Sequence, residues 1–183
     1  MKQDWKPGTM IYPLPAVLVS CGSEPSEYNI ITVSWVGTIC TNPAMCYISI
    51  RPGRHSYPIL KKNMEFVINL TTREMAYATD WCGVSSGKDY NKFKEMNLTP
   101  GKSKLVSAPI IEESPLCIEC RVKEVLALGS HDMFIADVVN VQADDAYLDP
   151  ETGAFDMLAY SHGKYYGLGE LIGKFGWSVK KKK

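Results

Sequence analysis

Short runs of apolar and β-branched residues, separated by clusters of glycine, proline, asparagine, aspartate and serine, recur along most of the chain. Runs of this length and composition predict β-strands, and the residues between them are typical of turns. The clearest runs are residues 10–21, 30–40, 45–51, 66–70, 116–128 and 133–145. Roughly six to eight strands with few helices favour a closed or nearly closed antiparallel β-barrel, because closure removes the exposed edges that promote aggregation.

Two features predict where strands lie in that barrel. Pro13 and Pro15 precede an apolar stretch and suit an edge or entering strand, since proline cannot donate a ladder hydrogen bond. The runs 116–128 and 133–145 are joined by a short connection that contains Gly-Ser-His. We therefore expect these two runs to form an antiparallel pair.

Helical signals are few and short. Ser56 suits the N-cap of a helix over residues 57–63. Residues 72–98 have helical propensity broken by Gly-Val-Ser-Ser-Gly, which predicts two short helices in an excursion from the β-core that covers a pocket. The glycine- and tyrosine-rich stretch 157–177 is expected to form loop and short helix.

Length and composition favour one soluble domain spanning residues 1–183. Hydrophobic residues make up 45% and charged residues 22%, which disfavours disorder and membrane classes. The 20 basic and 20 acidic residues balance, so no overall field attracts nucleic acid or a membrane surface. The first residues lack an apolar leader, so a cytoplasmic address is expected. The six cysteines are scattered through apolar runs, and we expect them to be reduced thiols.

Residues 28–43 read as a half-buried strand, yet one face carries Thr32, Ser34 and Thr38 where charge would be usual. Trp35 is expected on the opposite face because side chains alternate along a strand. Such hydroxyls either pack against backbone or line a groove that binds a flat polar ligand.

The following turn, residues 49–58, holds two arginines, Gly53 and the helix start expected at Ser56. These are the components of an anion site, although a solvated hairpin end explains the turn equally well. Because this turn is close in sequence to the hydroxyl face, one phosphate-bearing ligand could contact both.

Other candidate motifs fail on spacing. The glycines in residues 167–173 do not match the dinucleotide-binding pattern, since Gly173 comes one position late. Cys117 and Cys120 have CxxC spacing, but on a strand they point to opposite faces, so core thiols are the better interpretation. The three histidines, at 55, 131 and 162, lack metal-ligand spacing, and no metal site is expected.

Five segments, each weak alone, follow one another in order along nearly the whole chain: NIITVSW, SIRPGRHSYPILKKNMEFVINL, DYNKF, GSHDMFIADVVNV and YSHGKYYGLGELIG. Taken together in this order, they resemble the flavin reductase-like, FMN-binding split-barrel family, and within it the flavoredoxin type. This resemblance implies a mainly β Greek-key split barrel with a few short peripheral helices, assembled as a homodimer and binding FMN non-covalently.

The resemblance also implies positions for the cofactor. It places the strand that begins at Asn29 around the flavin and the arginine turn at the phosphate and ribityl chain. Lys92 is implied near the same ligand, and His131 beside the ring system as the catalytic-site residue. An aromatic position falls on Tyr165 or its neighbour Lys164. The implied cofactor-binding set is Asn29, Thr32, Ser34, Trp35, Arg51, His55, Ser56, Lys92, His131 and Tyr165.

Three functions follow from this resemblance. The first is an FMN-dependent oxidoreductase that accepts a hydride from NAD(P)H and passes electrons to a flavin or a partner. The second is a flavoredoxin-type carrier reduced by another redox protein, and the third is a flavin-binding protein without turnover. Because a flavin supplies its own hydride and electron chemistry, the lack of a recognisable catalytic triad is consistent with the first two.

Overall fold

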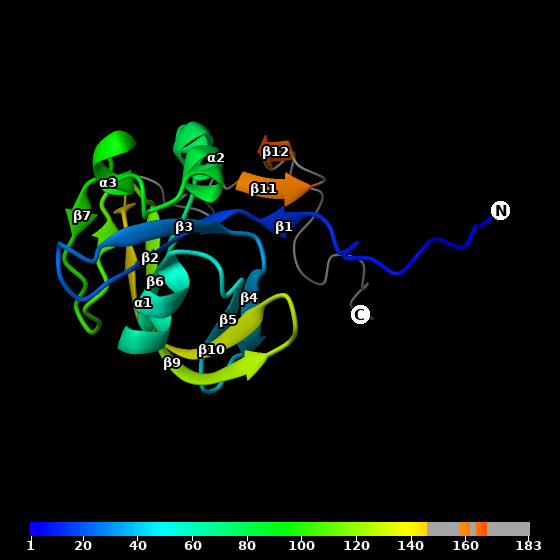
Figure 1. The fold of residues 1–183 in the computed structure, drawn as a ribbon, viewed down its shortest axis with the longest axis horizontal. Helices are drawn as coiled ribbons and strands as arrows, with labels where there is room; N and C mark the ends of the chain where they lie inside the picture. The colour runs from blue at the N-terminus through cyan, green and yellow to red at the C-terminus, as the bar shows by residue number, and fades with distance from the viewer. Residues whose placement is uncertain (146–157, 162–163, 168–183) are drawn as a thin grey trace, which may run out of the picture.

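The computed structural model describes residues 1–145, 158–161 and 164–167. Its main feature is a seven-stranded antiparallel sheet in the order β3-β2-β6-β9-β10-β5-β4 (Figure 1). The strands are β2 (Val17–Cys21), β3 (Asn29–Val33), β4 (Val36–Cys40), β5 (Met45–Ile50), β6 (Glu65–Leu70), β9 (Leu116–Ala127) and β10 (Asp132–Ala143). This confirms the mainly β prediction, including the antiparallel pairing of β9 with β10.

The sheet curls because its two edges belong to one continuous piece of chain. β3 forms one edge and β4 the other, yet only Ser34 and Trp35 separate them in sequence. The backbone N–H of Ser49 in β5 donates to the carbonyl of Trp35 at 2.8 Å, which ties this bend to the second edge. A sheet whose edges must meet at one end is a half-closed barrel, as predicted.

The bend also corrects the prediction of one strand over residues 30–40. The chain turns at Ser34 and Trp35 without a glycine or proline to signal it, so the run divides into β3 and β4. The edge prediction for residues 10–21 is likewise wrong in part. β2 is an inner strand between β3 and β6, whereas Pro15 belongs to the separate two-residue strand β1 (Leu14–Pro15) and Pro13 precedes that strand.

Helices cover both sides of β2 and β3. Val17 and Val19 face the barrel interior, where Leu60 of α1 (Ser56–Asn63) joins the core. On the opposite side, Leu18 and Ile30 pack with α2 (Ala76–Val84) and α3 (Lys92–Glu95), which Figure 1 shows above these strands. The excursion with two short helices is therefore confirmed, and it buries a sheet face that an uncovered barrel would leave in water.

Two small sheets complete the described structure. β7 (Pro100–Gly101) pairs with β8 (Ile110–Ile111), and β1 pairs with β11 (Leu158–Ser161), which pairs with β12 (Lys164–Gly167). The last two strands lie beside α2 (Figure 1). The prediction of loop and short helix over 157–177 is thus wrong for the part described. His162 lies outside the described residues.

A buried carboxylate fixes the loop before β8 to the barrel. Glu119 of β9 is 0% exposed and accepts hydrogen bonds from the backbone N–H groups of Lys104 (3.0 Å) and Leu105 (2.6 Å). The side chains of Asn140 (2.7 Å) and Gln142 (3.0 Å) also donate to it. Burial is the largest single influence and raises the pKa of Glu119, but the hydrogen bonds together outweigh it and hold the pKa below its usual value.

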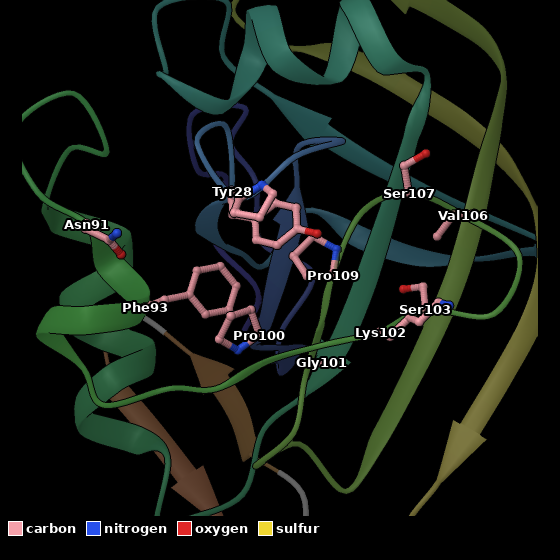
Figure 2. Close-up of a pocket in the computed structure, with 11 residues that line it drawn as sticks. Tyr28, Asn91, Phe93, Pro100, Gly101, Lys102, Ser103, Val106, Ser107 and Pro109 are labelled. Carbon is pink, nitrogen blue, oxygen red and sulfur yellow. The ribbon is translucent and has the colours of Figure 1, made fainter.

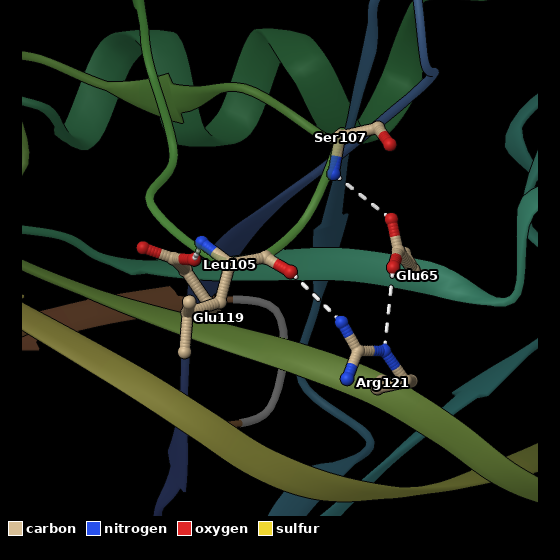
Figure 3. Close-up of polar contacts among 5 residues, drawn as sticks. All are labelled: Glu65, Leu105, Ser107, Glu119 and Arg121. Carbon is tan, nitrogen blue, oxygen red and sulfur yellow. Dashed lines mark hydrogen bonds and ion pairs between the residues drawn. The ribbon is translucent and has the colours of Figure 1, made fainter.

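Arg121 makes the second attachment of the same loop, as Figure 3 shows. Its Nη2 donates to the carbonyl of Leu105 at 2.8 Å, and its Nε lies 3.4 Å from Glu65 Oε1. Glu65 in turn accepts from the backbone N–H of Ser107 at 2.9 Å. Two acidic side chains therefore hold residues 104–107 against β6 and β9.

The six cysteines are free thiols, as expected. Cys117 and Cys120 point to opposite faces of β9: Cys117 packs with Val67 and Ala108, whereas Cys120 lies in the barrel core. Burial raises the pKa of Cys117 to about 11, so this thiol is protonated at neutral pH. In the described parts of the chain, no helix has the length and apolar character needed to cross a membrane.

Candidate functional site

Two adjoining cavities lie where β3 bends toward β4. The larger, which we call cavity A, has a volume of about 470 Å³ and is walled by the end of β3, the turn after β5, α2, the β9–β10 turn and the β11–β12 pair. The smaller, cavity B, has a volume of about 190 Å³ and lies between β3, the start of α1 and the loop after α2. Ile31, Arg54 and Gly83 line both, so the two cavities are neighbours.

The structure brings all of the sequence-predicted site residues to these two cavities. Those on cavity A are Thr32, Ser34, Trp35, Arg51, His131 and Tyr165. Those on cavity B are Asn29, His55, Ser56 and Lys92. Residues from five separate segments thus converge, although their roles toward a cofactor remain predictions.

The bend at Ser34 and Trp35 changes which side chains share a face. Trp35, expected to point away from the hydroxyls, lines cavity A with them because the alternation of a straight strand ends at Val33. Thr38, expected on the hydroxyl face, is exposed on β4 and does not line the cavity. Lys164, the alternative to Tyr165, is also absent from the described walls.

Sequence reasoning missed several wall residues. Arg54 was recognised as part of the arginine turn but was left out of the predicted set, and it lines both cavities. Ser85 and Ser86 contribute hydroxyls to cavity B from the Gly-Val-Ser-Ser-Gly break, and Tyr160 lines cavity A. The serine pair between two glycines was the available signal, whereas nothing local marks Tyr160.

Thr32 faces α2 rather than solvent, which explains a hydroxyl at this strand position. Its Oγ1 donates to the carbonyl of Thr79 at 2.5 Å. A Cβ atom placed on Gly83 would lie 3.2 Å from Thr32 Cβ, so helix and strand approach closely because residue 83 lacks a side chain. The Thr32 proton is used in this contact, and its oxygen keeps lone pairs toward cavity A.

The start of α1 differs from the prediction for Ser56. His55 occupies the N-cap position and makes no side-chain capping bond, while Ser56 is the first helical residue. Ser56 Oγ instead accepts from Asn29 Nδ2 at 2.7 Å, which fixes β3 against the helix. Both side chains are buried and line cavity B. The first-turn N–H groups of a helix have no intrahelical partner and favour anions.

The cations that line the cavities form no ion pair with the described residues, although Asp80 also lines cavity A. Lys92 is only 4% exposed, and its Nζ donates to the carbonyl of Cys82 at 2.6 Å. Burial lowers the pKa of Lys92, and the nearby Arg54 guanidinium lowers it further. Three ion pairs form in the described parts of the chain, and none includes Lys92, Arg54 or Arg51. This arrangement suits an anion that enters cavity B.

The outer wall of cavity A is an aromatic stack. The rings of Trp35 and His131 are 5.9 Å apart between centroids and inclined by 4°. Burial lowers the pKa of His131, and Arg51 lowers it further, so the imidazole is neutral at pH 7. Ser130 Oγ lies 2.9 Å from His131 Nδ1, within hydrogen-bonding distance.

Tyr165 forms the wall contributed by β12. Its ring meets that of Tyr160 edge-on, with centroids 5.6 Å apart. Burial raises the pKa of Tyr165 to about 12, helped by Asp80 and Tyr160. The phenol therefore stays protonated and offers a hydrogen-bond donor to cavity A.

Gly87 is expected to be required for the shape of cavity B. A Cβ atom there would lie 2.1 Å from Asn29 Oδ1, so Gly87→Ala must displace Asn29 from its contact with Ser56. We expect this variant to bind its ligand roughly tenfold more weakly, a loss of about 1.4 kcal/mol. Gly8→Ala is the control, since Gly8 lines neither cavity and a Cβ there meets its nearest atoms at 3.9 Å, an ordinary van der Waals contact. Isothermal titration calorimetry measures the affinity of each variant. Equal losses of affinity in the two variants would contradict the role of Gly87 in shaping cavity B.

A larger cavity of about 600 Å³ lies apart from this site, between α3 and the loop that precedes β8 (Figure 2). Tyr28 and Phe93 form its aromatic wall, with ring centroids 6.3 Å apart. It contains none of the predicted site residues and lacks the converging cations of cavities A and B. Size alone therefore does not identify the functional site. Across the described residues, no group of three potential metal ligands occurs.

The comparisons with known proteins agree with this geometry. A family model described as "Flavin reductase like domain" matches residues 9–169. An uncharacterized protein of Archaeoglobus fulgidus is 30% identical over 158 residues, which is 85% of this chain and 88% of that protein.

Two solved structures share the fold over almost their whole length. The flavoredoxin of Desulfovibrio vulgaris (Miyazaki F) is 27% identical with a TM-score of 0.89, covering 98% of this chain and 100% of that one. The flavoredoxin from Methanosarcina acetivorans, at 24% identity, has a TM-score of 0.88 with the same coverage. These matches indicate a flavin-related redox function. The chain belongs to the flavin reductase-like domain family.

Proposed function

We propose that this protein binds FMN non-covalently, with the ring system in cavity A and the phosphate in cavity B, and that the bound flavin accepts a hydride from NAD(P)H and passes electrons to a flavin or a partner protein. The observation that carries the proposal is the convergence of Arg54, Lys92 and Ser56 on a small cavity that adjoins a larger polar and aromatic one. A phosphorylated, flat heterocycle needs these two environments side by side.

The residues of cavity B fit a phosphate dianion. Arg54 and Lys92 supply positive charge without a carboxylate partner in the described structure, and Ser56, Ser85 and Ser86 supply hydroxyl donors. Hydrogen bonds between charged groups are about twice as strong as neutral ones, so this end of the ligand contributes most to retention.

The residues of cavity A fit the flavin ring. Ser34 and the protonated Tyr165 can donate hydrogen bonds to the polar edge, and the Trp35–His131 stack gives a flat wall. When bound, FMN supplies the hydride and electron transfer itself. The chain's own residues orient the ring and limit access of water, and the neutral His131 lies where a nicotinamide would approach.

A second candidate, a flavoredoxin-type carrier reduced by another redox protein, is favoured by one observation. The flavoredoxin of Desulfovibrio vulgaris matches this chain at 27% identity over 98% of its length. The same cavities serve either role, because the difference lies in the electron donor. The predicted homodimer and cytoplasmic address stay predictions.

Absorption spectroscopy of the purified protein tests the proposal. Saturation with FMN is expected to give a bound flavin spectrum, and anaerobic addition of NADH or NADPH is expected to bleach the flavin band within seconds. Bleaching that requires a protein donor would favour the carrier. Failure to take up any flavin would overturn both candidates and leave the fold with a different ligand.

A further inference from the structure

His55 separates cavity B from a further cavity on its outer side. This third cavity, which we call cavity C, has a volume of about 430 Å³ and lies between the β2–β3 turn and the loop before α3. Among the described residues, cavities B and C have two wall residues in common, His55 and Gly87. These two residues therefore form the partition between them.

The partition is closed by direct contact. A Cβ atom placed on Gly87 would lie 2.8 Å from His55 Cδ2, a separation that real Cβ atoms do not show. The imidazole thus packs against the bare backbone of Gly87. His55 makes no capping bond with α1, so its side chain acts here as a space-filling group rather than as a helix cap.

The partition determines what can be attached to a phosphate in cavity B. FMN ends at its phosphate, whereas FAD continues from that phosphate to a second phosphate and an adenosine. Under the proposed function cavity A holds the ring, so the adenosine half cannot leave in that direction. Cavity C lies on the other side, but the His55–Gly87 contact blocks the way.

Cavity C is chemically suited to a nucleoside once the way is open. Tyr28 and Tyr90 line it, and aromatic faces stack on nucleobases. The charges on this wall are mixed, because Glu27, which pairs with Lys62, and Asp89 line it beside the exposed Lys88, so cavity C offers a stacking surface for the uncharged nucleoside rather than a second phosphate site. The ring of Tyr90 is held edge-on by Trp81, with centroids 5.5 Å apart.

We propose that His55 is a specificity-determining residue: its ring, packed on Gly87, restricts the site to flavins with a terminal phosphate, and its removal joins cavity B to cavity C and admits FAD. This inference rests on the proposed FMN site and adds to it the side chain that selects the mononucleotide. The His55 ring is exposed, so its truncation leaves the buried core unchanged.

The test compares dissociation constants for FMN and FAD by quenching of flavin fluorescence. The wild-type protein is expected to prefer FMN by roughly tenfold or more, and His55→Ala is expected to reduce that preference by roughly tenfold. His55→Phe keeps a ring in the same place without the imidazole nitrogens, so it is expected to keep the preference. Adding Tyr90→Ala to His55→Ala is expected to weaken FAD again, since the adenosine loses its stacking partner.

Four outcomes overturn the inference. The first two are wild-type protein that binds FAD as tightly as FMN, and a preference for FMN that His55→Ala leaves unchanged. The third is an equal loss of preference in His55→Phe, which would make the effect electrostatic. The fourth is an increase in FAD affinity in His55→Ala that persists when Tyr90 is also replaced. If the wild-type protein binds FMN, each of these leaves the proposed function intact. If it binds neither flavin, the proposed function fails as well.

Discussion

Replacing Arg54 with alanine is expected to lower the affinity for FMN by about 30-fold, or about 2 kcal/mol. Arg54 lines both cavities, and no described carboxylate lies within ion-pair distance of its guanidinium. The guanidinium can therefore pair with the phosphate without breaking an ion pair among the described residues. Titration of the apoprotein with FMN at low and high salt measures the loss, which should shrink as ionic strength rises because screening weakens the exposed charge.

Lys94→Ala is the control for the loss of one positive charge. Lys94 is exposed on α3, two residues from Lys92, and lines neither cavity. Its replacement is expected to change FMN affinity by less than about twofold. Similar losses in both variants would show that net charge, rather than a phosphate contact at Arg54, sets the affinity.

Replacing Glu119 with alanine is expected to lower the free energy of unfolding by about 3 kcal/mol. The change leaves two backbone N–H groups and two side-chain amides without their buried acceptor. Denaturant unfolding followed by circular dichroism measures it. Glu124→Ala, at an exposed position of the same strand, is expected to cost less than about 0.5 kcal/mol. A small effect at Glu119 would mean that the loop before β8 adds little to stability.

The Glu119 effect should also depend on pH. Its folded-state pKa is lowered, so its stabilisation is fully present above the unfolded value of about 4.3 and is lost as pH falls through the folded value. The difference in stability between wild type and Glu119→Gln is therefore expected to be constant above about pH 5 and to diminish below about pH 4. A constant difference down to pH 3 would indicate that the carboxylate charge is not what the four donors recognise.

The strand pattern predicted the barrel because most runs are short, β-branched and bounded by turn residues. It failed where a tertiary contact replaces a local signal. The chain bends at Ser34 and Trp35 because it must pass from one sheet edge to the other, and neither residue is a turn former. β2 is an inner strand because β3 and β6 pair with its two edges, and the pairing with β6 joins segments far apart in sequence.

The candidate site was likewise predictable only in part. All ten residues that the five ordered segments placed around a cofactor lie on cavities A and B. Contacts between distant segments were not predictable: the stack of Trp35 on His131 joins residues far apart in sequence, and the pairing of Asn29 with Ser56 replaced an expected helix cap. Arg54 was missed because the sequence does not show which arginine side chains of a turn line a cavity, and in the structure both Arg51 and Arg54 do so.

The place where the chain passes from one margin of the sheet to the other has a mechanical consequence. Cavity A is bounded by Thr32 on β3 and by Ser49 on β5, the neighbour of the opposite margin. A molecule seated there touches both sides of the gap in the barrel and so crosslinks them non-covalently. Opening of the gap then requires release of that molecule, so occupancy of the cavity stabilises the folded protein by an amount that grows with the ratio of ligand concentration to dissociation constant.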